Sequence, residues 1–151
     1  VRQRATVDGI AEVVAELGME RAMILHTPGP YDEVSLTTSA CAVLVEQGRT
    51  QAMELSPERF GAKPIAASTL TGSDALGNAQ RILEVFSGER GPLADAICAN
   101  AACTFFVADR AKDFREGFEL AQATLESGRA LEKLRAVQAF VPQEERHVLA
   151  V

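Results

Sequence analysis

Apolar residues recur along the first part of the chain at two spacings, which predict first a helix and then a strand. One apolar side chain every three or four residues is typical of an amphipathic helix, and the first segment supplies Val7, Ile10, Val14 and Leu17. Thr6 or Asp8 can cap the start of this helix, and Gly18 is placed to end it. The apolar run at residues 21–26 then predicts a short buried strand. Two prolines and a glycine make residues 27–31 a loop, so helix, strand and loop together form half of an α/β unit.

Alternating and β-branched residues continue into a second β region. Residues 34–37, 41–46 and 50–55 have the composition of strands, and the last two flank a short turn that predicts a hairpin with one face toward solvent. Residues 56–59 begin with Ser-Pro, which predicts a single helical turn with the serine as cap and the proline at the first position. Residues 61–71 show no regular pattern, and we expect connecting chain there.

The spacing of apolar residues farther along the chain predicts helices. Ser73 or Asp74 begins the first of them, whose buried face is expected to hold Ala79, Ile82, Leu83 and Phe86. Pro92 opens the next helix, and its middle is small or apolar all round, which should make it the central helix of the domain. A capping box at residues 113–116 starts a third helix, and Gly128 separates that helix from a last one.

Composition places the chain among ordinary globular proteins. It has 151 residues, 47% of them hydrophobic and 24% charged, which is enough for one domain with a core but not comfortably for two. The net charge of -6 and the scattered lysines and arginines argue against nucleic acid as a partner. There is no apolar stretch of about 18 residues that would predict a membrane-spanning helix, and no secretory signal opens the chain.

The three cysteines, Cys41, Cys98 and Cys103, stand among apolar or small residues and have no CxxC spacing. This pattern predicts buried thiols in a reducing compartment rather than disulfides or a metal site. Apolar surroundings raise the pKa of a thiol, so a cysteine nucleophile activated by a histidine is not expected.

The strongest candidate for chemistry is the adjacent pair Asp32 and Glu33, which follows the loop after the first strand. Carboxylate oxygens suit Mg²⁺, which takes one or two protein carboxylates and completes its shell with water and substrate phosphates. An isolated acidic pair is more often a solvated surface feature, so the surrounding sequence has to support this assignment.

Other polar positions have simpler explanations. His26, at the end of the first strand, is expected to hydrogen-bond to loop backbone rather than to act in the site. Asn78 and Asn100 lie on otherwise apolar helical faces and are expected to be hydrogen-bonding core residues rather than ligands. Residues 72–74 are most simply a helix N-terminus, although such termini can bind anions. His147 lies in the tail and carries little weight.

Several of these segments together resemble one enzyme family. The sequence HTPGPYDEVSL at residues 26–36 resembles the His-Gly-x-Gly-Gly-x-Asp-Glu-x-Ser-Leu segment of anthranilate phosphoribosyltransferases, with the same spacing from the histidine to the acidic pair. LSPERFG at residues 55–61 resembles their Pro-Glu-x-Phe-Gly turn, and GSDALGNA at residues 72–79 is similar to their Gly-Gly-Asp-Ala-x-x-Asn-Ala helix start. Three shorter segments recur in the same order, namely GERGP at 88–92, NAA at 100–102 and SGRAL at 127–131. The resemblance covers about residues 21–137.

This resemblance implies a fold and a reaction. Residues 1–140 would be the C-terminal part of the family's α/β domain, with an edge hairpin and four to five helices, and residues 141–151 would be a tail. The reaction would be transfer of the phosphoribosyl group of PRPP to anthranilate, a step of tryptophan biosynthesis, in a cytoplasmic enzyme whose full-length form is a homodimer. Asp32 and Glu33 would be the ligands of Mg²⁺ on the pyrophosphate, and no residue would act as a nucleophile.

Other parts of the family's site have no counterpart in the chain. We expect the N-terminal helical domain, the Gly-Thr-Gly-Gly-Asp phosphate loop, the Lys-His-Gly segment and the anthranilate-binding arginine upstream of Val1, and the chain alone to be inactive. Val1 in place of an initiating methionine fits such an incomplete sequence. Thr27 and Pro30 replace loop glycines of the family, and proline has no N–H to offer a phosphate. Two alternatives therefore stay open: a related enzyme of the same fold, such as a pyrimidine nucleoside phosphorylase, and a non-catalytic binding or assembly module.

Overall fold

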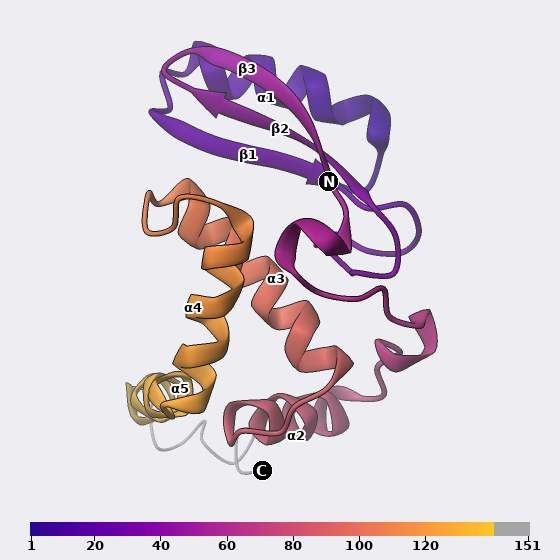
Figure 1. Cartoon of the computed structure of the whole chain (residues 1–151), viewed down its shortest axis with the longest axis vertical. Coiled ribbons are helices and arrows are strands. Elements are labelled where there is room, and N and C mark those ends of the chain that lie inside the picture. Colours follow the sequence, from indigo (N-terminus) through magenta and orange to yellow (C-terminus); the bar gives the residue numbers. More distant parts are fainter. Residues whose placement is uncertain (141–151) are drawn as a thin grey trace.

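Three strands form one antiparallel sheet in the order β1-β2-β3, which is also their order along the chain. Their bounds are β1 Arg21–His26, β2 Ala40–Glu46 and β3 Arg49–Leu55. The computed structural model describes residues 1–140, and Figure 1 shows the sheet at one end of the molecule. Val43 in the central strand lies opposite Ile24 of β1 and Ala52 of β3. The predicted hairpin is confirmed, with β3 as an edge strand.

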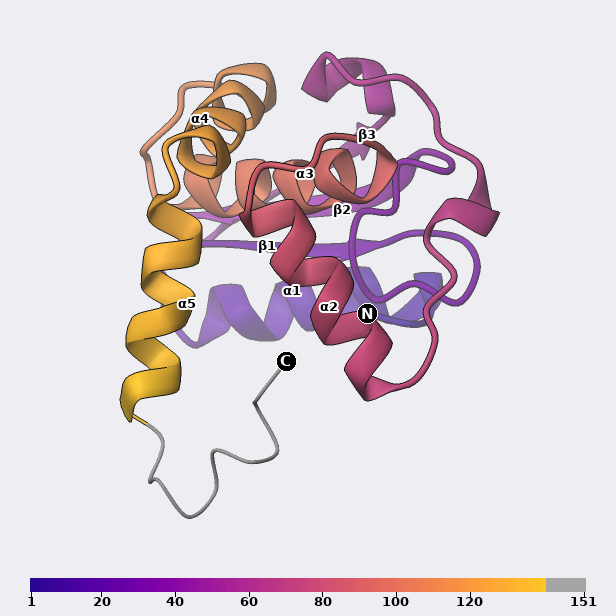
Figure 2. The ribbon, with the colours of Figure 1, turned by 90° about the horizontal axis from the view of Figure 1, so that it is seen from below.

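Five α-helices of the described residues surround this sheet. Their bounds are α1 Val7–Glu16, α2 Ala75–Phe86, α3 Pro92–Val107, α4 Phe114–Glu126 and α5 Arg129–Phe140. Helix α1 lies against one face of the sheet and α3 with α4 lies beyond the other face, while α2 and α5 lie farthest from it (Figure 1, Figure 2). None of these helices is long and apolar enough to cross a membrane. The α/β class and the expected number of helices are confirmed.

The core is divided between the two faces of the sheet. The smaller cluster joins α1 to the strands through the buried residues Val7, Ala11, Ile24, Val43 and Val45. The larger cluster joins β2 and β3 to α3 and α4, and includes Leu36, Leu55, Phe60, Ala99 and Phe118. Helix α3 contributes mostly alanines and cysteines to it. Small side chains let α4 approach α3 closely, which confirms the central position predicted for α3.

The residues at the helix ends determine where the helices begin and end, either through capping hydrogen bonds or through a positive φ. The carboxylate of Asp74 accepts a hydrogen bond from the Gly77 N–H at 2.8 Å at the start of α2. The carboxylate of Asp113 accepts one from the Glu116 N–H at 2.9 Å at the start of α4, as the predicted capping box requires. Gly18 ends α1 with a φ of 74°. Thr6 precedes α1 without capping it through its side chain, because its hydroxyl donates to the Gln3 carbonyl instead.

The strand predicted at residues 34–37 is wrong. Leu36 has a φ of 59°, which turns the backbone out of the extended conformation. Ser35 reinforces the turn, since its Oγ accepts a hydrogen bond from the Thr37 N–H at 3.2 Å. Val34 and Leu36 are nevertheless fully buried, so the apolar pattern identified core positions and misassigned only their conformation.

The buried face predicted for α2 is also wrong in part. Val85 is the residue of α2 that is buried, whereas Ile82 is 41% exposed and Ala79, Leu83 and Phe86 are half-buried. Helix α2 lies far from the sheet, so its apolar face contacts little of the described chain (Figure 1). Strand β1 likewise has one fully buried position and is otherwise half-buried. The predicted tail lies outside the described residues.

Candidate functional site

The acidic pair lies on the loop that connects β1 to the buried turn at Leu36. Both Asp32 and Glu33 are exposed, as a pair that binds a ligand from solvent must be. The Asp32 N–H donates to Oε2 of Glu33 at 3.2 Å, which turns the Glu33 carboxylate back toward its own loop. The structure therefore places the two predicted site residues side by side on the surface, directly after β1.

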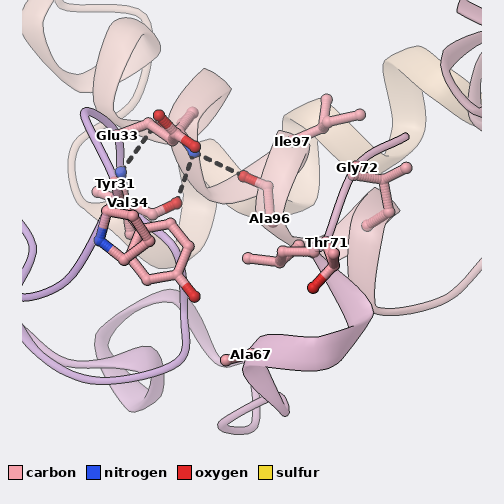
Figure 3. A pocket seen from close by; sticks show the side chains of 12 residues that line it. Tyr31, Glu33, Val34, Ala67, Thr71, Gly72, Ala96 and Ile97 are labelled. Atoms are coloured by element: carbon pink, nitrogen blue, oxygen red, sulfur yellow. Dashed lines mark hydrogen bonds between the residues drawn. The ribbon is translucent and has the colours of Figure 1, made fainter. Parts of the chain in front are cut away.

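Glu33 reaches the rim of a large open pocket. The pocket has a volume of about 740 Å³ and lies between the loop, the chain before α2 and helix α3. Its lining residues are mostly apolar, and Figure 3 shows Tyr31 and Val34 from the loop near Ala96 of α3, with Ile97, Thr71 and Gly72 on the other side. Glu33 is the one charged residue among the lining residues, and Asp32 is not one of them. The Glu33 carboxylate brings a negative charge to the rim, which attracts a cation.

The backbone at Glu33 is held from two sides. The hydroxyl of Thr27 donates to the Glu33 carbonyl at 2.7 Å, and Thr27 is completely buried. The Val34 N–H, which belongs to the same peptide group, donates to Oδ1 of Asn100 at 3.0 Å. Both polar atoms of the peptide group between Glu33 and Val34 therefore have a side-chain partner.

Asn100 holds the loop with its whole amide group. Besides accepting from Val34, its Nδ2 donates to the Val34 carbonyl at 2.7 Å and to the Ala96 carbonyl at 2.8 Å. Figure 3 draws these bonds as dashed lines. The bonds use the amide oxygen and both N–H groups, and this pattern fixes which atom is nitrogen. The prediction of a hydrogen-bonding residue is confirmed, but its partner lies 66 positions away and no sequence pattern indicated it.

The site offers a metal ion two carboxylates and no more. Among residues 1–140, no three side chains of histidine, cysteine, aspartate or glutamate gather as a metal centre would require. Two carboxylates fit Mg²⁺, which keeps several waters and binds through one or two carboxylates plus substrate phosphates.

The other predicted candidates are occupied in structural roles. Nδ1 of His26 lies 3.0 Å from the carbonyl oxygen of Val1, so backbone does satisfy this ring, although not the backbone of its own loop. Burial raises the pKa of the Cys98 thiol to about 11 and that of Cys103 to about 12, which excludes a thiolate nucleophile at neutral pH. Cys41 is half-buried, and all three cysteines are free, as predicted. His147 lies outside the described residues.

The N-terminus of α2 is closed by its own side chains. Oδ1 of Asn78 accepts from the Ser73 N–H at 2.9 Å, and Asp74 caps the next turn. Gly72 leaves room for this arrangement, because an added Cβ would lie 2.8 Å from Oδ1 of Asn78. The segment predicted as a helix N-terminus is confirmed, and the N–H groups at 73 and 77 already have protein partners. The pocket wall formed by Thr71 and Gly72, like Tyr31 on the loop, was not predicted from the sequence.

Comparisons with known proteins all identify the same family, and they do so over most of the chain. A family model described as "Glycosyl transferase family, a/b domain" matches residues 1–131. The anthranilate phosphoribosyltransferase of Petrotoga mobilis is 34% identical over 131 residues, which are 87% of this chain and 38% of that protein. That of Acetivibrio thermocellus is 38% identical over 125 residues, or 83% and 36% of the two chains. The chain thus spans well under half the length of the curated relatives it matches.

Solved structures give the same result for the fold. The anthranilate phosphoribosyltransferase of Thermus thermophilus superposes with a TM-score of 0.77 at 32% identity, covering 89% of this chain and 39% of that one. The Saccharomyces cerevisiae enzyme, solved in complex with PRPP and Mg, superposes with a TM-score of 0.79 over the same shares of the two chains. At 22% identity the yeast structure supports the likeness of fold alone.

Proposed function

The chain belongs to the glycosyl transferase family through its a/b domain, and on that premise we propose that it is part of an anthranilate phosphoribosyltransferase. The relatives from Petrotoga mobilis and Acetivibrio thermocellus carry this activity in their names. Because the chain spans about 38% of the first of them, the activity is proposed for the whole protein and not for these residues alone. In that protein, residues 1–140 would be the C-terminal part of the α/β domain and residues 141–151 a tail.

The observation that carries the proposal is the place of the acidic pair. Asp32 and Glu33 lie on an exposed loop whose backbone is fixed by hydrogen bonds, and Glu33 is one of the residues that line a pocket of about 740 Å³. We propose that these two carboxylates hold Mg²⁺ on the pyrophosphate of PRPP. The yeast enzyme of the same fold is known in complex with PRPP and Mg, which supports this choice of metal and substrate.

In the proposed reaction, Asp32 and Glu33 have to supply negative charge at the right position, and no further chemistry is required of them. The bond between ribose C1 and the pyrophosphate oxygen breaks, a bond from C1 to the anthranilate nitrogen forms, and that nitrogen releases one proton to water or to the departing pyrophosphate. Bound Mg²⁺ would neutralise the charge that grows on the leaving pyrophosphate. The carboxylates of Asp32 and Glu33 would hold the metal ion at the loop, and neither would transfer a proton.

The experiment replaces the two carboxylates in the whole protein. Asp32→Asn with Glu33→Gln should lower kcat/KM by more than about a hundredfold, because several kcal/mol of charge stabilisation is lost. Turnover is followed by the loss of anthranilate fluorescence with PRPP and Mg²⁺. The matched control is Glu12→Gln with Glu16→Gln, which removes the same charge from exposed positions of α1. Activity of the site variant equal to that of the control would refute the metal assignment.

The two alternatives lead to different results in the same preparation. A nucleoside phosphorylase would cleave a pyrimidine nucleoside with inorganic phosphate and leave anthranilate unchanged. A non-catalytic module would do neither. Thr27 and Pro30 are the departures that favour the non-catalytic alternative. Thr27 is buried and hydrogen-bonded within the loop, whereas Pro30 lines the pocket, so Pro30 is the departure that a ligand would meet. A homodimer in the cytoplasm completes the proposal, and light scattering on the whole protein tests the dimer.

A further inference from the structure

We propose that Thr27 and Asn100 are positioning residues for Glu33, an inference that rests on the proposed metal site. Together they fix the peptide group between Glu33 and Val34. That peptide group sets the direction in which the Glu33 side chain leaves the backbone. The two residues thus determine where the carboxylate points without touching the metal or the substrate themselves.

The geometry of the peptide group carries the argument. Its carbonyl oxygen accepts from the Thr27 hydroxyl at 2.7 Å, and its N–H donates to Asn100 at 3.0 Å. A peptide group is planar, and its oxygen and hydrogen point in opposite directions. A partner on each side therefore prevents the plane from rotating, since any rotation would break both bonds. Connecting loops are in general more mobile than the helices and strands that they join, so these two bonds matter here.

Thr27 is suited to this role because, among residues 1–140, its hydroxyl bonds to the Glu33 carbonyl and to no other group. It is completely buried, and a buried hydroxyl needs a partner, which the Glu33 carbonyl supplies six residues along the chain. The bond closes residues 27–33 into a small loop that starts at the end of β1. The glycine found at this position in the resembled family has no side chain and cannot make the bond. The bond is a feature of this chain, where Pro30 also limits the loop.

Asn100 supplies the connection to the rigid part of the fold. It lies in the middle of α3, the central helix, and its third bond, to the Ala96 carbonyl, fixes the amide against its own helix. A side chain whose donors and acceptor are all engaged has one orientation. The loop is thereby tied to α3 by a pair of bonds to Val34, one to its N–H and one to its carbonyl.

The test compares metal binding in Thr27 variants of the whole enzyme. Thr27→Val keeps the shape and removes the hydroxyl, and should weaken Mn²⁺ binding about tenfold, as the loss of an outer partner of a metal ligand does. Thr27→Ser keeps the hydroxyl and should bind Mn²⁺ within twofold of the unchanged protein. Binding is measured by the loss of the EPR signal of free Mn²⁺. The Mg²⁺ concentration for half-maximal rate should rise in parallel, while kcat at saturating Mg²⁺ is retained.

The control is Thr124→Val, which removes a hydroxyl bonded to a carbonyl at 2.8 Å in α4, and it should leave metal binding unchanged. The inference is overturned if Thr27→Val binds Mn²⁺ as tightly as the unchanged protein. It is also overturned if Thr27→Ser binds Mn²⁺ as weakly as Thr27→Val. If Thr27→Val does not fold, Thr27→Ser and Thr27→Ala decide the question, because they differ only in the hydroxyl oxygen.

The failure of this inference can be told from failure of the proposed function. If Asp32→Asn with Glu33→Gln abolishes Mn²⁺ binding but the Thr27 variants bind normally, the metal site stands and the positioning role is refuted. If the double substitution leaves Mn²⁺ binding unchanged, the metal site itself is refuted and the positioning role with it.

Discussion

Replacing Gly117 with alanine sets two known effects against each other. Gly117 lies in α4, where alanine favours the helix over glycine by about 1 kcal/mol. An added Cβ would, however, lie 2.9 Å from the carbonyl oxygen of Ala102, 3.0 Å from its Cα and 3.1 Å from its Cβ. Two of these atoms are backbone of α3, and they cannot move aside without moving the helix. The substitution therefore forces α4 away from α3 inside the larger core cluster.

The cost of this displacement should exceed the gain in helix propensity. Overpacking a filled core typically costs about 1–3 kcal/mol, and contacts with backbone belong at the upper end of that range. We expect Gly117→Ala to lower the free energy of unfolding by about 1–2 kcal/mol after the propensity gain of about 1 kcal/mol is subtracted. The measurement is urea unfolding followed by far-ultraviolet circular dichroism.

The chain contains a matched control in Gly9 of α1. An added Cβ there would meet nothing within 4 Å, so Gly9→Ala should raise the free energy of unfolding by up to about 1 kcal/mol. The two variants make the same chemical change in two helices and should shift the urea midpoint in opposite directions. If Gly117→Ala stabilises the protein as Gly9→Ala does, the contact between α3 and α4 is looser than this argument requires.

Two further predictions concern titration and capping. Burial raises the pKa of the Cys103 thiol from 9.0 to about 12, so the unfolded chain loses this proton first as the pH rises. The free energy of unfolding should therefore fall between about pH 9 and pH 12, and less steeply in Cys103→Ala; equal slopes in urea titrations would contradict the burial argument. Asp113→Ala should lower the free energy of unfolding by about 1 kcal/mol by removing the cap of α4, whereas Asp113→Asn should change it by a few tenths. Equal losses in the same urea assay would show that the cap bond contributes nothing.

Most of the fold could be predicted where local spacing and local chemistry agree. The strand at Arg21–His26 and the start of α3 at Pro92 were predicted because apolar runs, prolines and glycines act within a few residues. The turn at residues 34–37 was mistaken for a strand because its buried side chains have the same pattern as a strand. Its conformation depends on the positive φ of Leu36 and the side chain of Ser35, which hydrophobic spacing does not record.

The candidate site could be predicted only as far as its residues are adjacent in the chain. Asp32 and Glu33 were predicted as a pair because they are neighbours in the chain and follow a loop. The pocket beside them depends on Thr71 and Ala96, which come from distant segments. Such contacts arise when the helices pack, and a single sequence does not show which helix face meets which loop.

Helix α3 links the core and the site through two residues that are close in sequence. Asn100 holds the loop of the acidic pair, and Ala102 forms the contact with Gly117 of α4. Successive residues of an α-helix are turned by about 100°, so positions two apart point to nearly opposite sides. One side of α3 is therefore fixed by close packing against α4, and the other side fixes the peptide group at Glu33. We therefore expect Gly117→Ala, which displaces α3 relative to α4, also to displace Asn100 and the loop that it holds, and Mn²⁺ binding by this variant of the whole protein tests that expectation.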